Sequence, residues 1–580
     1  MVTLPDTRQS RQTHYGLPDR LLAGGLLLIP IIVFWYVWDR YAVNVPKWDD
    51  HVLKVLLFNL EKETSFSEKF YEFIRQHNEH RIVYDRLITW LDFTISGKLN
   101  YRHLMVVGNL SLLGLLLIFG VVLGRSLVGQ NKNQSIDYLA NGLVYLPPVA
   151  FLLLNLSQWE NMFWGMAALQ NFTVILWVFW AAYLLSFTRP ISLPLLLAIA
   201  ATLTSGNGLL IWPIGFAILL AQKIFRARSS YKPLVIWSIG AIVIIALYFW
   251  GYQKPPGNPV VKGSFVDLII GWLAFNGAAG EAFPFRIVLT MCLLLGGALS
   301  VLVLGALLYI LKKGLTQREL SSIDYFFAAA TVFLLTTAAT VAWGRLGFGM
   351  STLITSRYKI YSLLLLALAY SYILVQTRPS QRKWVLRSGL LFSVVLMVSS
   401  YRMYLDEAIS LRQYLLTKQF DWTYSTNRPI SAIDPQTARI LNNSPAFYDR
   451  ILPDLYRPVN GSSVPFSSIN KTGDSFVFTD TTAVTSIGPD AGTYILARSA
   501  KRIYLFPTIP TLTSSWKANI GLQDLFRKGI SSSFSEAELD SATYQIERLI
   551  VRADGGFERH PTDQTITAAP QKRRDIQKNW

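Results

Sequence analysis

Two adjacent carboxylates, Asp49 and Asp50, are the residues whose type and position point most directly to chemistry. They follow the first apolar segment by about ten residues, at the start of a polar loop. Ionisable groups beside a membrane are costly to keep near lipid and therefore indicate a functional site. Either carboxylate could act as a general base on an acceptor hydroxyl, or help to hold a divalent cation such as Mg²⁺ or Mn²⁺. The alternative is a solvated turn or a helix N-cap, where aspartate is favoured.

Four of the six histidines lie in or beside this same loop, among them His51, His77 and His80. His77 and His80 are spaced i, i+3, which would place them on one face of a helix and makes a metal site conceivable. The spacing is not a specific zinc signature, so we assign no metal ligands. Hydrogen bonding to a sugar or phosphate by these histidines, Glu79 and Arg81 is favoured over zinc, and plain packing is the simplest alternative.

A second group with chemical potential is Trp159-Glu160-Asn161, in a short loop after the third apolar segment. Tryptophans beside a carboxylate suit stacking on a sugar face combined with hydrogen bonds to its hydroxyls. An aromatic belt at a membrane interface would explain the tryptophan equally well. Glu160 is the feature that such a belt does not require.

A third group is cationic and follows the ninth apolar segment. Arg345 lies among three glycines, and Arg357, Tyr358 and Lys359 follow in the same loop. Arginine binds phosphate in bidentate fashion, and glycine lets the backbone approach a ligand closely. The alternative is anchoring to lipid headgroups. We favour an anion-binding role because both arginines flank one loop and could face one ligand.

The composition limits the elements that can position these residues. The chain of 580 residues is 52% hydrophobic and only 16% charged. Together with apolar runs near 20 residues, this predicts an α-helical polytopic membrane protein. The net charge of +18 comes from basic residues spread over loops between apolar runs, not from a stripe interleaved with aromatics. We therefore expect membrane lipids as partners and no nucleic acid.

The apolar runs predict about eleven transmembrane helices. The expected spans are 21–38, 103–124, 137–155, 169–187, 190–204, 208–222, 233–252, 286–311, 324–343, 358–376 and 384–401. The span 190–204 is short and contains Pro194, so a re-entrant hairpin with its neighbour is an alternative. Lys and Arg concentrate in alternate short loops, which by the positive-inside rule places the N-terminus in the cytoplasm. An odd number of spans then places everything after 401 outside.

Three regions follow from this pattern. Residues 1–401 form the transmembrane module, whose outer loop 39–102 carries amphipathic segments at 50–60, 66–76 and 81–92, expected to be helices lying in the interface. Residues 402–560 form a small extracytoplasmic β-rich domain, with strands expected around 475–478, 494–497, 502–506 and 546–551. The tail 561–580 is expected to be disordered.

The arrangement of these features resembles a known group of enzymes. An acidic first outer loop with interfacial helices, an acid in the next outer loop, a late arginine-containing outer loop and an outer C-terminal domain resemble the GT-C superfamily of polyprenyl-phosphate-dependent glycosyltransferases. The stretches Trp159-Glu160-Asn161 and Ser356-Arg357-Tyr358 are also similar to those of uncharacterised bacterial membrane proteins. The resemblance covers roughly 1–401. GT-C enzymes usually carry an Asp-Glu pair where this chain has Asp49-Asp50, which leaves open which aspartate is catalytic.

The resemblance implies a bacterial cytoplasmic-membrane enzyme with a sugar on polyprenyl phosphate as donor and a cell-envelope glycan or lipid as acceptor. One carboxylate of Asp49-Asp50 would deprotonate the acceptor hydroxyl, and the reaction would invert the anomeric carbon. Arg345 and Arg357, with Lys359, would stabilise the departing lipid phosphate. Glu160 would position hydroxyl groups of the donor or acceptor.

Three other function classes stay open. A flippase for lipid-linked glycans would place ionisable residues inside the spans and show internal repeats, and this chain has neither feature clearly. A glycan polymerase or ligase would differ in its acceptor more than in its site chemistry. A non-catalytic anchor for the C-terminal domain would need far fewer than eleven spans and would leave Asp49-Asp50 and Arg345 unexplained.

Overall fold

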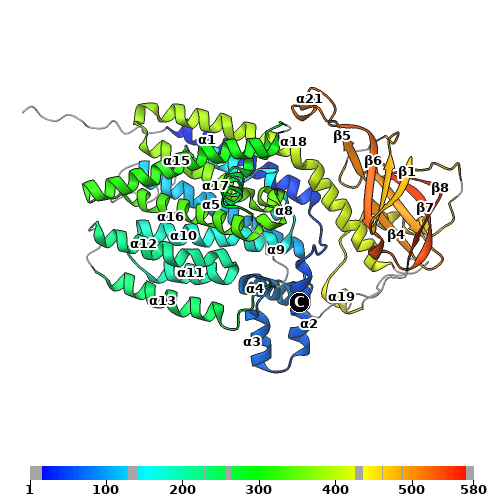
Figure 1. Ribbon diagram of the computed structural model, residues 1–580, viewed down its shortest axis with the longest axis horizontal. Helices are drawn as coiled ribbons and strands as arrows, with labels where there is room; N and C mark the ends of the chain where they lie inside the picture. The colour runs from blue at the N-terminus through cyan, green and yellow to red at the C-terminus, as the bar shows by residue number, and fades with distance from the viewer. Residues whose placement is uncertain are drawn as a thin grey trace, which may run out of the picture.

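A bundle of long helices and a smaller β-rich region are joined by one very long helix, α18 (Arg382–Thr423), in the computed structural model (Figure 1). The structure describes residues 16–127, 140, 142–225, 230–255, 263–285, 287–424, 435–459, 461–484 and 488–569. Among these residues, nine helical stretches are long and apolar enough to cross a membrane. They contain α1 (Leu17–Tyr41), α5 (Tyr101–Leu127), α10 (Thr173–Phe187), α12 (Ile211–Ile224), α13 (Lys232–Phe249), α15 (Val288–Gln317), α16 (Ser322–Arg345), α17 (Lys359–Gln376) and α18.

Nine of the eleven expected spans coincide with these helices, and two do not. Within 137–155 the structure describes the short helix α7 (Pro147–Leu153), while residues 137–139 and 141 lie outside the described part of the chain. The expected span 190–204 is α11 (Ser192–Thr204), whose 13 residues fall short of the roughly 20 that a bilayer core requires. A further apolar helix, α14 (Phe265–Asn276), occupies a region where the sequence pattern predicted no span.

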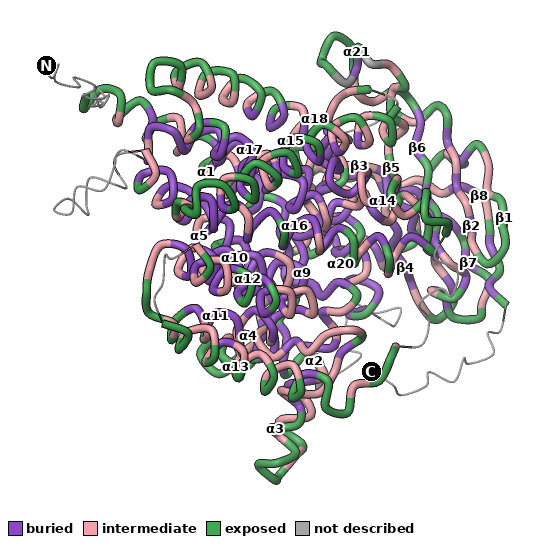
Figure 2. The backbone as a smooth tube through the Cα atoms, turned by 60° about the vertical axis from the view of Figure 1, so that its left-hand side comes forward, coloured by how far each residue is buried: buried purple, intermediate pink, exposed green. Residues whose placement is uncertain are grey.

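The bundle is layered around α17. Within an apolar window of 18 residues, 78% of the stretch that contains α17 (Ser356–Gln376) is buried, but only 11% of α13. Figure 2 shows the same contrast, with buried backbone at the centre and exposed backbone on the outer helices. A helix that exposes apolar side chains nearly all round is suited to lipid rather than water. The outer helices α13 and α15 have this character, which agrees with a multi-pass membrane protein.

The loop after α1 folds into the three helices expected from its amphipathic pattern. They are α2 (Asp50–Lys62), α3 (Phe66–Ile74) and α4 (Val83–Ser96). Local signals explain their limits: the Ser65 side chain accepts a hydrogen bond from the Glu68 amide, and Gly97 ends α4 with φ of 68°. These helices project beside the bundle and carry a loop, residues 75–82, back towards it (Figure 1).

The C-terminal region is a sandwich of two four-stranded antiparallel sheets, with orders β1-β2-β6-β5 and β4-β3-β7-β8. The four expected strands are confirmed as β2, β3, β4 and β7. Stacked aromatic rings pack the two sheets together. The ring centroids of Phe506 on β4 and Phe534 on β6 lie 3.6 Å apart, and the rings are nearly parallel. The strands are β1 (Ser468–Thr472), β2 (Ser475–Asp480), β3 (Gly492–Arg498), β4 (Ile503–Pro507), β5 (Ile509–Leu512), β6 (Phe526–Ser535), β7 (Ala542–Val551) and β8 (Phe557–Ala568).

Two expected boundaries are wrong. Residue 561 lies inside β8, which pairs with β7 as far as Ala568, so the expected disordered tail begins too early; residues 570–580 lie outside the described part. The boundary at 401 falls inside α18, a single helix of 42 residues and about 63 Å. Beyond 401 this helix is fastened to the sandwich, since Arg412 forms a two-bond ion pair with Asp490 and the Asp421 carboxylate accepts the Leu505 amide.

Candidate functional site

Asp50 is buried and fastens the turn that leads into α2. Its carboxylate accepts the Lys47 amide at 3.0 Å and the Met166 amide at 2.8 Å, and its side chain is fully inaccessible. Burial raises the pKa of the Asp50 carboxyl to about 7, against the opposing effect of these two amides. The Trp48 backbone, with φ of 45°, makes the sharp bend that this anchoring requires.

Asp49 has a different environment although it is the next residue in the chain. Its side chain is 39% exposed and lines a cavity, with Oδ1 4.0 Å from His77 Nε2. Partial burial raises the pKa of Asp49, and the positive charge of Arg357 acts in the opposite direction. The structure therefore places one member of the pair at an accessible cavity and the other inside the protein.

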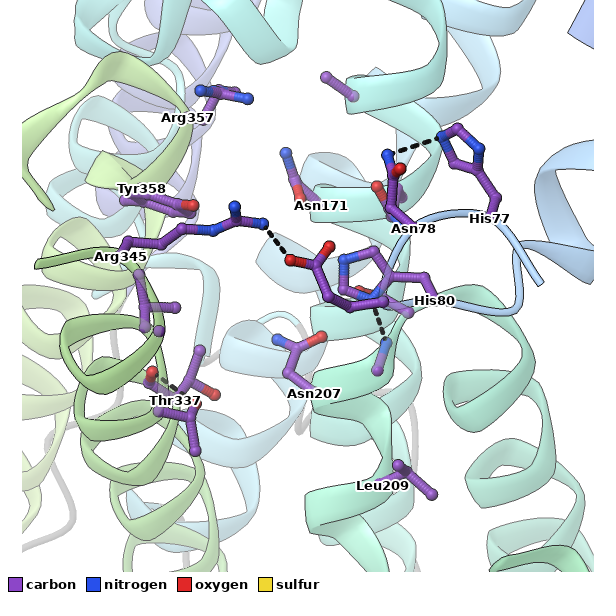
Figure 3. A pocket seen from close by; sticks show the side chains of 18 of the residues that line it. His77, Asn78, His80, Asn171, Asn207, Leu209, Thr337, Arg345, Arg357 and Tyr358 are labelled. Carbon is purple, nitrogen blue, oxygen red and sulfur yellow. Dashed lines mark hydrogen bonds and ion pairs between the residues drawn. The ribbon is translucent and has the colours of Figure 1, made fainter. Parts of the chain in front are cut away.

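The cavity has a volume of about 530 Å³ and brings together residues that are far apart in the sequence. Figure 3 shows Arg345, Arg357 and Tyr358 on one side, facing His80, Asn171 and Asn207 on the other. The predicted site residues that line it are Asp49, His77, Glu79, His80, Arg345, Arg357 and Tyr358. It is formed by the loop at 77–80, the start of η3 (Gly206–Leu210), the ends of α13 and α16, and η7 (Ser356–Tyr358).

The two histidines of the cavity are neutral at neutral pH. Burial lowers the pKa of both His77 and His80 to about 4, and the nearby arginines act in the same direction. The Gly206 amide donates to His80 Nδ1 at 3.1 Å, so the remaining proton of the neutral ring lies on Nε2. The loop around them is a tight turn, in which His77 and His80 exchange backbone hydrogen bonds, rather than the helical turn considered from their spacing.

Two charged groups hold the arginines in place. Arg345 Nη2 lies 2.9 Å from Glu79 Oε1. Arg357 Nε lies 3.6 Å from Glu160 Oε2, while Glu160 Oε1 accepts from Lys47 Nζ at 3.2 Å. Glu160 is thus shared by two cations at the edge of the cavity.

Lys47 is a site residue that the sequence analysis did not single out. Its ammonium group is buried among the rings of Trp48, Trp159 and Trp164, at 4.3, 5.5 and 4.8 Å from their centroids. Burial lowers the pKa of Lys47, and Glu160 opposes that change. Lys47 lies two residues before Asp49 in a segment rich in charged residues, so no sequence signal indicated a buried position.

Several predicted residues lie outside the cavity lining and act as supports. His51 packs against the Trp422 ring, 5.4 Å away. Arg81 donates to the carbonyls of Tyr248, Ile74 and Trp250. These bonds tie the loop that carries His77 and His80, here called the histidine loop, to the end of α13. Three predicted residues remain. The Trp159 ring contacts the Lys47 ammonium group, and the Asn161 side-chain amide donates to the Arg357 carbonyl. Lys359 donates a hydrogen bond to the Tyr404 hydroxyl and forms an ion pair with Glu281.

Some residues that line the cavity also carry a buried polar atom that has no hydrogen-bond partner among the described residues. These atoms are Trp164 Nε1, Gln170 Nε2, Asn207 Oδ1, Thr337 Oγ1 and Arg357 Nε, of which the last still lies 3.6 Å from Glu160 Oε2. Buried polar atoms are normally satisfied, so these unpartnered atoms beside the cavity are unusual for a protein interior. Gln170 belongs to a single π-helical turn, η2 (Ala168–Phe172), a distortion that often marks functional sites. Such a turn leaves no pattern in the sequence.

Close packing brings this π-helical turn to the cavity. Gly108 on α5 lies so near Ala168 that a Cβ there would come within 2.3 Å of the Ala168 carbonyl carbon. Any larger residue at this position would push the turn, with Gln170 and Asn171, away from α5. The local geometry of the site therefore depends on one glycine that carries no chemistry itself.

A divalent cation would need several oxygen or nitrogen ligands that converge on one point. Within the described part of the chain, no group of three or more His, Cys, Asp or Glu side chains is arranged to hold a metal ion. Asp49 and the two histidines share the cavity without forming such a group.

The comparisons with known proteins identify no relative. No family model, curated protein or solved structure matches the chain.

Proposed function

We propose that this chain is a membrane glycosyltransferase that moves a sugar from a polyprenyl-phosphate donor to a cell-envelope glycan or lipid acceptor. The observation that carries the proposal is the cavity itself. It combines one accessible carboxylate, two arginines and polar side chains that include Asn171 and Asn207, in about 530 Å³. A carboxylate serves to remove a proton, arginines bind a phosphate, and polar donors and acceptors bind sugar hydroxyls.

In the proposed reaction Asp49 takes the proton of an acceptor hydroxyl. The acceptor oxygen forms a bond to the anomeric carbon while the bond from that carbon to the phosphate oxygen breaks, with inversion. The electron pair leaves with the polyprenyl phosphate, whose negative charge Arg345 and Arg357 stabilise. The neutral His80, with a proton on Nε2, can donate a hydrogen bond to a sugar hydroxyl. Because its ring carries no positive charge, it does not compete with the two arginines for the phosphate.

The orientation of the cavity supports an extracytoplasmic reaction. The cavity lies where α13 and α16 end, next to the start of α12, at one end of the bundle. Basic residues at or beyond the opposite helix ends include Arg125, Arg189, Lys223, Lys313 and Arg378. Cytoplasmic loops retain Lys and Arg, so the end bearing the cavity would face outwards.

The test is sugar transfer by the purified full-length protein in nanodiscs. Wild type would be offered a panel of polyprenyl-phosphate sugars with envelope glycan and lipid acceptors, and release of polyprenyl phosphate would be measured. We expect Asp49→Asn to lower turnover by about a hundredfold or more and Arg345→Ala to lower it by a similar factor, both with unchanged Tm.

Lys62→Ala supplies a matched control, because Lys62 is an exposed cation at the end of α2 and lies outside the cavity lining. Transfer that continues at the wild-type rate in Asp49→Asn would show that the base lies elsewhere. If transfer occurs only when the acceptor is itself lipid-linked, the enzyme is a glycan polymerase or ligase with the same site.

A further inference from the structure

The sandwich carries a small apolar surface that faces solvent near α21 (Trp516–Asn519). Ile520 and Leu522, directly after this helix, are 45% and 71% exposed, and Leu512 at the end of β5 is 48% exposed. Exposing large apolar side chains to water is unfavourable, so a cluster of them on a loop tip commonly marks a contact surface. We call Ile520 and Leu522, with their basic neighbours, the α21 tip.

The basic neighbours are Lys517, Arg527 and Lys528, all exposed, and one exposed acid, Asp524, lies among them. Apolar side chains flanked by cations are typical of segments that lie on membranes containing anionic lipids.

The position of the α21 tip is fixed by α18. On that helix Leu391, Val395 and Val398 are 68%, 50% and 65% exposed, and their spacing of i, i+4, i+7 makes one apolar stripe. The next residue of the same stripe, at i+11, is Arg402. Its guanidinium donates to the Ala518 carbonyl at 2.5 and 3.0 Å and lies 3.5 Å from the Gln523 carbonyl.

The α21 tip therefore stands at the end of the stripe through which α18 would contact lipid. Figure 1 shows α21 beside α18, where the helical bundle gives way to the sandwich. The segment that leads into α15 is also exposed at this level. The Ser399 hydroxyl of α18 donates to the Ala282 carbonyl, and three and five residues further along the chain Phe285 and Ile287 are 52% and 58% exposed. Apolar residues at the boundary continue from the bundle to the sandwich.

We propose that the α21 tip rests on the outer surface of the membrane, with Ile520 and Leu522 inserted between headgroups and its cations over anionic lipids. Together with Arg402 it would fix the height and tilt of the sandwich over the bilayer. This inference depends on α18 crossing a membrane and is independent of the transferase reaction.

The test places a fluorescent probe at the α21 tip of the full-length protein. Cys292 is the only cysteine, so Cys292→Ser provides a background for Leu522→Cys labelled with bimane. The labelled protein is reconstituted in nanodiscs that contain lipids carrying a nitroxide near the headgroup. Asp474→Cys is the matched control, because this exposed turn residue lies at the opposite end of β6 from Phe526, about 30 Å away.

We expect nitroxide lipids to quench the probe at 522 at least about twofold more than the probe at 474, and more strongly with anionic than with zwitterionic lipids. Reversing the charge of Lys517, Arg527 and Lys528 should remove the dependence on anionic lipid. Equal, weak quenching at both positions would overturn the proposal. So would a blue-shifted but unquenched probe at 522, because protein rather than lipid would then cover the tip. Quenching that is the same in both lipids would overturn the role of the cations.

Discussion

At the scale of single residues, Asp49 and Asp50 show how neighbouring side chains of one type acquire different chemistry. The sharp bend at Trp48 directs Asp50 towards the backbone of residues 47 and 166, while Asp49 lines the cavity. A buried carboxylate that accepts hydrogen bonds from two backbone amides stabilises the local fold. A partly exposed carboxylate opposite arginines can take part in a reaction.

The burial of Asp50 predicts a dependence of stability on pH. Its pKa of about 7 in the folded protein exceeds the usual 3.8, so the folded state binds more protons between these values and the carboxyl's contribution to stability falls as pH rises. Between pH 5 and 8 this contribution should fall by about 2–3 kcal/mol. Asp50→Asn does not titrate, so the stability of wild type relative to this variant should decrease over that range.

The measurement is chemical unfolding of both proteins in detergent at several pH values. His51, His77 and His80 have lowered pKa values and change stability in the opposite direction, but they are present in both proteins and cancel in the difference. A difference that does not vary with pH would contradict the assignment of Asp50 as a buried, titrating carboxyl.

The Lys47–Glu160 pair predicts a separation of stability from activity. Glu160→Gln leaves the buried ammonium of Lys47 without its counter-charge and should lower the free energy of unfolding by about 3–5 kcal/mol. Adding Lys47→Met to that variant should restore most of the stability. Transfer should stay low in the double variant, because Arg357 still lacks the carboxylate that orients it.

Thermal unfolding and transfer assays on the two variants test this expectation. Full activity in the double variant would show that Glu160 serves only to neutralise Lys47.

At the scale of elements, the loop 76–81 reaches the cavity because other elements hold it there. Arg81 donates to three carbonyls, from Tyr248, Ile74 and Trp250, and so joins the end of α3 to the end of α13. Gln76 adds bonds with the backbone of Asn78 and Gln253. Side chains that satisfy carbonyls at helix ends are an efficient way to fix a loop without regular structure.

Arg81→Ala should therefore loosen the histidine loop without removing a group from the cavity. We expect a loss of stability of about 1–3 kcal/mol, since the partly buried carbonyls of Tyr248 and Ile74 lose their donor. Amide hydrogen exchange across 76–81 should become faster, and KM should rise more than kcat falls because substrate contacts are displaced. Unchanged exchange in this loop, with Lys62→Ala as the matched control, would contradict the role given to Arg81.

At the scale of the whole molecule, α18 couples the two parts of the protein. Its length of about 63 Å is roughly twice the hydrocarbon thickness of a bilayer, so a large part must project beyond the membrane if the helix crosses it. The projecting part is bonded to the sandwich through Arg412, Gln413 and Asp421. The sandwich is therefore held on the same end of the bundle as the cavity.

This arrangement predicts that the loop helices α2, α3 and α4 and the sandwich lie on the same, outer side of the membrane. In the Cys292→Ser background, Ser67→Cys on α3 and Asp474→Cys in the sandwich should react in intact cells with a membrane-impermeant maleimide. Gln317→Cys, at the opposite end of α15, should react only after permeabilisation. Labelling of all three positions, or of Gln317→Cys alone, would contradict the proposed topology.

The amino-acid sequence by itself determined the helical character of the chain, nine of its long apolar helices, the three loop helices and four strands, because these depend on local periodicity and segment length. It also selected seven residues that line the cavity. Their assembly was decided by tertiary structure, since Asp49, His80, Arg345 and Arg357 come from separate segments that only helix packing brings together. The different fates of Asp49 and Asp50, the burial of Lys47 and the unpartnered atoms near the π-helical turn depend on solvent access and contacts across the fold. A one-dimensional pattern contains no measure of either.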